Sequence, residues 1–388
     1  MEWKEVTLSE IGTIVGGATP STKNTSFYDG NIPWLTPKDL SVNSNKFIFR
    51  GERNITEAGF KSCSCKMLPK GSVLFSSRAP IGYVAIAAND MCTNQGFKSV
   101  IPNEETDSEF LYYLLKYNKD NIASQGSGTT FAEVSGKTMK EIEVMVPKET
   151  DDQRRIASIL SSLDRKIELN NKINADLEEM AQAIFKNWFV DFEPFKDGKF
   201  VDSELGMIPE GWKVGTLDEI FSLKYGKNLS TSMILEKGDY PVYGANGIIG
   251  YYNEFNCDKY SVLVTSRGNG SGDVSRTHHP KSFITNNSFV VEPLEHYKYI
   301  KLPFINGLFN IIDFKSYCSG SAQPQLTNKA MRNICIISPP RELVIKYCEI
   351  LETLFSHIEC VIDENSRLSL LRDTLLPRLM SGEIEVPE

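Results

Sequence analysis

The sequence predicts a mixed α/β (α+β) protein in which two globular domains with short-stranded mixed sheets are separated by two long helices that form an antiparallel coiled coil. Three observations favour this fold class: the chain repeats itself once, a heptad pattern of apolar residues follows each copy, and the remaining apolar residues fall in short runs between Gly-rich loops. A chain of 388 residues is long enough for two domains. We expect the first domain at 1–150, the first helix at 151–195, a linker at 196–210, the second domain at 211–338 and the second helix at 339–388.

The duplication is clearest where each domain begins. Residues 3–11 (Trp-Lys-Glu-Val-Thr-Leu-Ser-Glu-Ile) match residues 212–220 (Trp-Lys-Val-Gly-Thr-Leu-Asp-Glu-Ile) at an offset of 209. Residues 70–78 match 259–267 at six of nine positions. At an offset of 192, Thr93-Asn94 is paired with Thr285-Asn286 and Ser127-Gly128 with Ser319-Gly320. Since this spacing far exceeds the period of a repeat array, about 20–50 residues, it indicates a duplicated domain.

Short β-branched and aromatic runs predict strands within each domain. We expect strands at Ser72–Phe75, Tyr83–Ala87, Phe97–Ile101 and Ile142–Val146 in the first copy, and at Val262–Thr265 and Ser288–Glu292 in the second. A helix is expected at Phe110–Lys116. Its counterpart at Lys301–Ile312 contains Pro303 and Gly307, so we expect that helix to be broken.

Each domain is followed by apolar residues spaced alternately four and three apart, which is typical of a coiled-coil seam. Thr150 to Gln153 predict a capping box at the start of the first helix, and Ser338-Pro339 predict the start of the second. Pro194 should end the first helix, and Pro377 should kink or end the second. We expect the helices to pair through Ile156, Leu160, Leu163, Ile167, Asn174, Leu177, Ile184, Trp188, Tyr347, Leu351, Leu354, Ile358, Val361, Asn365, Leu368 and Leu375.

Asn174 and Asn365 occupy the same seam position in the two copies, where a buried Asn commonly fixes register. The alternative that each helix simply packs on its own domain stays open. Arg372 interrupts the pattern, and Leu371 beside it could fill the gap.

The net charge of −8 is unevenly distributed. Residues 1–150 and 196–340 carry −1 and +1, so the acidity lies in the helical stretches 151–195 and 341–388, with −3 and −5. Residues 46–78 hold seven positive and two negative side chains. Because binding responds to the local field, the whole-chain charge does not exclude nucleic acid.

The motifs of several enzyme classes are incomplete. Ser135-Gly136-Lys137-Thr138 resembles the end of a P-loop, but Phe131 stands where the first glycine should be. Residues 268–272 do not form a dinucleotide-binding motif, and Cys63-x-Cys65 lacks zinc-ligand spacing. We therefore expect no catalytic residues, no cofactor and no metal on this chain. The eight Cys are expected as reduced thiols in the cytoplasm, and we expect neither a signal peptide nor a membrane span.

The matched loops instead carry residue types that suit DNA. Arg can contact guanine or phosphate, amides can read adenine edges, and hydroxyl groups in Gly-rich loops can approach the backbone. The alternative is that these residues simply form turns or internal pairs. The predicted DNA-binding residues are Ser76, Ser77, Arg78, Asn94, Gln95, Thr129 and Thr130 in the first copy, and Ser266, Arg267, Asn269, Asn286, Asn287, Gln323 and Gln325 in the second.

Two long segments carry a resemblance to a known family. The junction 187–195 (Asn-Trp-Phe-Val-Asp-Phe-Glu-Pro-Phe) leading to 203–212 (Ser-Glu-Leu-Gly-Met-Ile-Pro-Glu-Gly-Trp) is similar to the central region of type I restriction-modification specificity subunits. The tail 375–384 (Leu-Leu-Pro-Arg-Leu-Met-Ser-Gly-Glu-Ile) is similar to their distal region. The chain as a whole resembles that family over nearly its full length.

The resemblance implies a non-catalytic subunit with two target-recognition domains, each reading one half of a bipartite target in double-stranded DNA. It implies two methyltransferase subunits docked on the helices, with restriction subunits expected as well. S-adenosylmethionine, ATP and Mg would then be bound by these partners. The alternatives are a coiled-coil adaptor that assembles proteins without reading DNA, and an enzyme with an unrecognised site.

Overall fold

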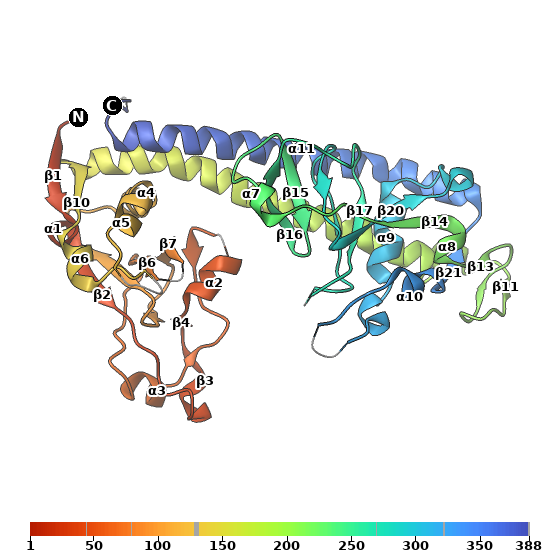
Figure 1. The fold of residues 1–388 in the computed structure, drawn as a ribbon, viewed down its shortest axis with the longest axis horizontal. Coiled ribbons are helices and arrows are strands. Elements are labelled where there is room, and N and C mark those ends of the chain that lie inside the picture. The colour runs from red at the N-terminus through yellow and green to blue at the C-terminus, as the bar shows by residue number, and fades with distance from the viewer. Residues whose placement is uncertain (44, 79, 128–131, 269, 321–322, 387–388) are drawn as a thin grey trace. The chain divides into compact units, whose positions relative to one another are not determined.

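The computed structural model describes residues 1–43, 45–78, 80–127, 132–268, 270–320 and 323–386, and the chain divides into two compact units (Figure 1). Unit 1 comprises Met1–Leu169 and Asn365–Glu388, and unit 2 comprises Asn170–Glu364. Each unit therefore contains one globular domain together with a part of both long helices.

The domain of unit 1 is built on a five-stranded sheet in the order β2-β9-β6-β7-β5. Its neighbours are antiparallel except for β5 and β7, which run parallel, and two smaller sheets pair β1 with β10 and β4 with β8. The elements are β1 (Trp3–Thr7), α1 (Leu8–Ile11), β2 (Gly12–Gly16), η1 (Thr25–Phe27), β3 (Tyr28–Ile32), β4 (Trp34–Leu35), α2 (Pro37–Val42), β5 (Phe47–Ile48), α3 (Glu57–Lys61), β6 (Val73–Ser77), β7 (Ile81–Ala87), β8 (Cys92–Thr93), β9 (Lys98–Pro102), α4 (Ser108–Tyr117), α5 (Lys119–Ser124), α6 (Gly136–Glu141) and β10 (Glu143–Pro147).

The domain of unit 2 contains a four-stranded antiparallel sheet in the order β14-β20-β17-β18 and a three-stranded sheet β16-β15-β19. Strands β13 and β21 form a separate antiparallel pair, as do β11 and β12. The elements are η2 (Glu193–Phe195), β11 (Phe200–Val201), β12 (Ile208–Pro209), β13 (Lys213–Thr216), α8 (Leu217–Ile220), β14 (Phe221–Tyr225), η3 (Thr231–Met233), β15 (Tyr240–Gly244), β16 (Gly247–Tyr252), β17 (Val262–Thr265), β18 (Val274–Arg276), β19 (Phe283–Ile284), β20 (Ser288–Pro293), η4 (Glu295–Tyr297), α9 (Leu302–Ile311), η5 (Phe314–Tyr317), α10 (Asn328–Arg332) and β21 (Cys335–Ser338).

The two domains repeat one topology. The order β14-β20-β17-β18 reproduces β2-β9-β6-β7, and the pair β13·β21 reproduces β1·β10. The first turn after the opening strand closes with a capping box in both, Thr7 with Glu10 and Thr216 with Glu219. The structure therefore confirms the mixed α/β fold with two similar domains.

The backbone corrects one part of the sequence pairing. The Asn94 amide donates to the Leu35 carbonyl at 2.8 Å, and the Thr285 amide donates to the Tyr243 carbonyl at 3.0 Å. Asn94 is thus equivalent to Thr285, one residue earlier than the repeated Thr-Asn dipeptide predicts. The offset between the copies grows from 189 at β6 and β17 to 191 here, one less than the 192 that the repeated dipeptide predicts.

The predicted helix after the first domain is α7 (Thr150–Phe189), and the one after the second is α11 (Arg341–Met380). The predicted capping box does not form with Gln153, since this buried amide donates to the carbonyls of Glu105 and Pro147 and accepts from the Asp107 amide. Ser338 ends β21, and α11 begins only at Arg341.

Two expectations about helix breaks need correction. Pro377 does not end α11, which continues to Met380, and a kink there stays a prediction. The helix α9 is unbroken, because Pro303 stands in its first turn, where its missing amide hydrogen is not needed. Gly307 permits close packing: a Cβ there would lie 2.1 Å from the Phe185 ring.

In unit 1, the first part of α7 packs against the last part of α11. Ile156 and Leu160 share a buried cluster with Leu379 and Met380, which also contains residues of α4. One turn further along α7, Asp164 and Arg372 form an ion pair of 2.8 Å. The partner number falls as the α7 number rises, so the helices run antiparallel in this unit.

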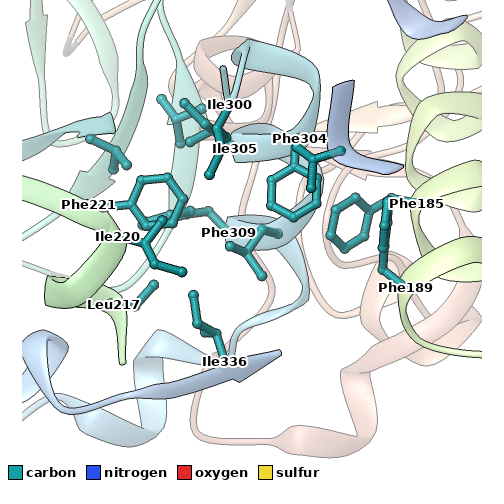
Figure 2. Packing of buried hydrophobic residues seen from close by; sticks show 14 of the residues in the cluster. Phe185, Phe189, Leu217, Ile220, Phe221, Ile300, Phe304, Ile305, Phe309 and Ile336 are labelled. Carbon is teal, nitrogen blue, oxygen red and sulfur yellow. The ribbon is translucent and has the colours of Figure 1, made fainter. Parts of the chain in front are cut away.

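In unit 2, the second part of α7 packs against the first part of α11. The side-chain amide of Asn170 donates to Glu364 at 2.8 Å. Further along α7, Phe189 packs against Tyr347 with ring centroids 5.0 Å apart. The order is again antiparallel. Figure 2 shows Phe185 and Phe189 of α7 facing Phe304, behind which the domain core continues.

All sixteen predicted seam residues are buried or half-buried. Leu371 does not fill the gap in the pattern, because 47% of it is exposed and Arg372 turns inward to Asp164 instead. The residue-by-residue pairing of the seam stays a prediction.

Candidate nucleic-acid interface

Three loops meet at the end of strand β6 in unit 1. The Ser77 amide donates to the Gly96 carbonyl at 2.8 Å, and the Ser77 carbonyl accepts from the Val134 amide at 3.0 Å. Glu133 forms isolated bridges with both Arg78 and Ser127. The strand end therefore joins the loop after β8 to the loop between α5 and α6.

The charged side chains at this junction belong to Arg78, Lys98 and Glu133. Lys98 Nζ lies 3.2 Å from Glu133 Oε1 and 3.4 Å from Ser77 Oγ. Arg78 Nη1 lies 3.8 Å from Glu133 Oε2. A carboxylate thus lies between two cations at the edge where the predicted DNA-binding residues converge.

The two amides predicted for this site differ in exposure. Asn94 is half-buried, and its Oδ1 accepts from the Gly96 amide at 2.8 Å, which fixes the turn. Gln95 is exposed and accepts from the Thr19 hydroxyl. Gly17 lets the preceding loop approach, since a Cβ there would lie 2.2 Å from the Thr93 and Asn94 carbonyl oxygens.

The hydroxyl groups of Ser76 and Ser77 point inward. Both residues are fully buried. Ser76 Oγ donates to the Pro80 carbonyl and accepts from the Tyr83 amide, both at 2.8 Å, and Ser77 Oγ donates to the Gly96 carbonyl. Their burial disfavours the predicted DNA contact, because these side chains hold the strand end in shape.

The same three loops meet at the end of β17 in unit 2. The Ser266 amide donates to the Asn287 carbonyl at 2.7 Å, and the Ser266 carbonyl accepts from the Leu326 amide at 2.9 Å. Gln325 forms bridges with Arg267 and Ser319, as Glu133 does with Arg78 and Ser127. The duplication therefore preserves the loop junction as well as the sheet.

Exposure at the second junction follows a similar pattern. Ser266 is fully buried, which disfavours a DNA contact by its side chain, whereas Arg267 is exposed. Asn286, Asn287 and Gln325 are half-buried, and Gln323 is exposed. The predicted Thr129, Thr130 and Asn269 lie outside the described residues.

The Gly-rich turn after Arg267 is tied to the loop before Gln325. The Gly268 amide and the Ser271 hydroxyl donate to the Pro324 carbonyl at 3.2 Å and 2.6 Å. Sequence reasoning missed Lys98 and Glu133 at the first junction. Glu133 could have been found, because it stands 192 residues before Gln325, the offset that already pairs Ser127 with Ser319.

A group of thiols lies behind the first junction, next to β8. Cys65 Sγ donates to the Thr93 carbonyl at 3.6 Å, and a hydrogen bond with Cys92 lowers the pKa of Cys65 to about 7. The same hydrogen bond raises the pKa of Cys92. Across the described part of the chain, no three His, Cys, Asp or Glu side chains are grouped so that they could hold a metal ion.

Comparison with known proteins gives this architecture a family. The family described as "Type I restriction modification DNA specificity domain" matches residues 1–179 and again residues 209–368, one match for each domain. The chain belongs to this family.

Some curated relatives match nearly the whole chain. The type I restriction enzyme MjaIX specificity subunit of Methanocaldococcus jannaschii is 36% identical over all of this chain and 94% of its own length. The EcoprrI specificity subunit of Escherichia coli is 26% identical over 95% of this chain and 90% of its own. The S subunit crystal structure from M. genitalium has the same fold, with a TM-score of 0.55 and 21% identity over 98% of this chain and 96% of that chain.

The family assignment settles the role of the chain in broad terms. It is a specificity subunit of a type I restriction-modification system and is not itself the enzyme, since these relatives are named for specificity. None of the helices in the described ranges combines the length and apolar character that a bilayer crossing requires.

Proposed function

We propose that this specificity subunit reads a bipartite target in double-stranded DNA, with one recognition domain for each half-site. The observation that supports this most is the repeated loop junction: in each domain three loops meet at the end of the equivalent strand and carry an Arg beside amide side chains. Arg and amide groups are the side chains that read base edges in the major groove. Because the two junctions differ in sequence, the half-sites should differ too.

The helices complete the proposal. Two methyltransferase subunits would dock on α7 and α11, whose exposed faces are acidic and suit protein better than phosphate. Restriction subunits would join them in the cytoplasm. S-adenosylmethionine, ATP and Mg would be held by these partners.

The test is to express the chain with its partner methyltransferase and to sequence the methylated adenines. We expect modification within two short sequences separated by a fixed spacer. Adding one heptad to both α7 and α11 should change the spacer and keep both half-sites. A variant that methylates with the original spacer would contradict the role given to the helices.

A second measurement separates this function from that of a protein-assembly adaptor. The complex should bind a duplex carrying the mapped target with an affinity that falls steeply as salt rises, since phosphate contacts release counterions. An assembled complex whose DNA binding is the same with and without this chain would overturn the proposal.

A further inference from the structure

The first loop junction holds a carboxylate that masks positive charge. Glu133 has 40% of its side chain exposed and lies between Lys98, at 3.2 Å, and Arg78, at 3.8 Å. Lys98 is only 15% exposed, so its ammonium group is directed by this contact. In a partly shielded site an ion pair is screened less than in open water, and a DNA phosphate must compete with Glu133 for both cations.

The second junction has the same backbone and different charges. In the sheet register, Lys98 pairs with Gly16 in unit 1, and Phe289 pairs with Tyr225 in unit 2, so Phe289 replaces the lysine. Phe289 is fully buried in the core.

Gln325 replaces the carboxylate of the first junction. It takes the bridge position opposite Arg267 that Glu133 takes opposite Arg78. Arg267 is exposed, and no carboxylate of the described residues lies within 4.0 Å of its guanidinium group. The second junction therefore presents a cation that no carboxylate masks, since Asp273 of the same loop pairs with Lys315 at 2.7 Å instead.

We propose that Glu133 is a specificity-determining residue: it withholds Arg78 and Lys98 from DNA phosphates, whereas Gln325 leaves Arg267 free to bind one. This inference rests on the proposed function and deepens it. Phosphate contacts carry no sequence information, while base contacts do. The first domain then depends more on base reading, and the second supplies more of the sequence-independent attraction.

The isosteric pair Glu133→Gln and Gln325→Glu tests the proposal in the complex with the methyltransferase, on a labelled duplex carrying the mapped target. The readout is the slope of log binding constant against log salt, which changes by about 0.9 for each phosphate contact. Glu133→Gln should steepen the slope, and Gln325→Glu should flatten it. One contact corresponds to a change of about three- to fourfold in affinity between 50 and 200 mM salt. Glu104→Gln, an exposed carboxylate in the loop between β9 and α4, is the control for net charge.

Arginine variants complete a double-mutant cycle. Arg267→Gln should flatten the slope by about 0.9 in the otherwise unchanged chain, and Arg78→Gln by less than half as much. In the Glu133→Gln background, Arg78→Gln should reach the effect of Arg267→Gln. Equal effects of the two arginines without Glu133→Gln, or an unchanged slope in Glu133→Gln, would overturn the inference. If the complex without any substitution methylates no specific target, the proposed function itself is overturned.

Discussion

The two units attach their domains to the long helices by different chemistry. In unit 1 a polar network lies beside the apolar cluster of the helices: Lys46, 2% exposed, donates to Glu109 at 2.7 Å and to Ser161 of α7 at 2.9 Å. Tyr113 of α4 donates to Asp164 at 2.5 Å, and Arg372 binds the other oxygen of that carboxylate. A network of this kind fixes one orientation and is costly to break, because each removal leaves another polar group buried.

In unit 2 the corresponding contacts are mostly aromatic, with one ion pair of 2.9 Å between Arg276 of β18 and Glu178 of α7. Phe185 and Phe189 of α7, Phe304 of α9 and Tyr347 of α11 pack with ring centroids between 4.9 and 6.2 Å apart, mostly edge to face. Such packing depends on shape and volume rather than on charge. The two copies of the fold therefore hold their domains on the helices by different kinds of contact. We expect the stability of the two units to respond differently to substitution and to pH.

The largest expected effect is that of Asp164→Ala in unit 1. The substitution leaves the Arg372 guanidinium and the Tyr113 hydroxyl without their shared partner, and losing one member of a buried ion pair costs about 3–5 kcal/mol. Hydrogen exchange should accelerate in α4 and β10 and stay unchanged in β14 and β20. The matched control is Asp373→Ala, which removes the exposed partner of the same Arg372 and should cost under about 1 kcal/mol. Equal losses of stability from both variants would show that the buried ion pair stabilises unit 1 no more than the exposed one.

The aromatic attachment is tested by overpacking. Gly307→Ala places a methyl group against the Phe185 ring, and inserting volume into a packed core costs about 1–3 kcal/mol. Combining it with Phe185→Leu should cost less than the sum of the two changes, because the smaller side chain relieves the clash. Asn310→Ala, an exposed change on the same helix, is the control. If the losses of stability simply add in the double variant, the close contact between Gly307 and the Phe185 ring is contradicted.

Much of this architecture could be predicted from the sequence, because the duplication shows the pattern of an element in two copies. Strand β17 has the predicted bounds, Val262–Thr265, and α4 and α7 lie where apolar periodicity places them. Two helix breaks were predicted where the helices continue, because a proline in the first turn, or late in a long packed helix, is tolerated when tertiary contacts compensate. Those tertiary contacts cannot be predicted from the local sequence.

The loop sites were predicted only in part. Arg78 and Arg267 could be picked out from the internal repeat, since each ends a Ser-Arg pair that both copies share. That Ser77 would be buried, and that Glu133 would face Arg78, could not be read from the sequence because both depend on which loops fold together. Matching identical residues between the two copies overlooks positions where the copies differ, such as Glu133 and Gln325.

The smallest expected effect is a difference in the pH windows of the two units. All four His lie in unit 2, and burial lowers the pKa of His278 and His279. Their unfolded forms take up protons near pH 6.5, so the stability of unit 2 should begin to fall as pH drops through that value. Burial raises the pKa of Glu359, which opposes this loss.

Unit 1 should respond only at lower pH. Burial alone would raise the pKa of Glu109, but hydrogen bonds from Lys46 and Ser161 bring it below its ordinary value of 4.5. A lowered carboxylate pKa stabilises the fold above that value and loses the contribution as pH falls further. Hydrogen exchange, corrected for the intrinsic rate, should therefore loosen unit 2 first between pH 6.5 and 5. Gln at both 278 and 279 should remove that early loss, whereas the same change at the exposed His357 should not; simultaneous loosening of both units near pH 6 would contradict the contrast.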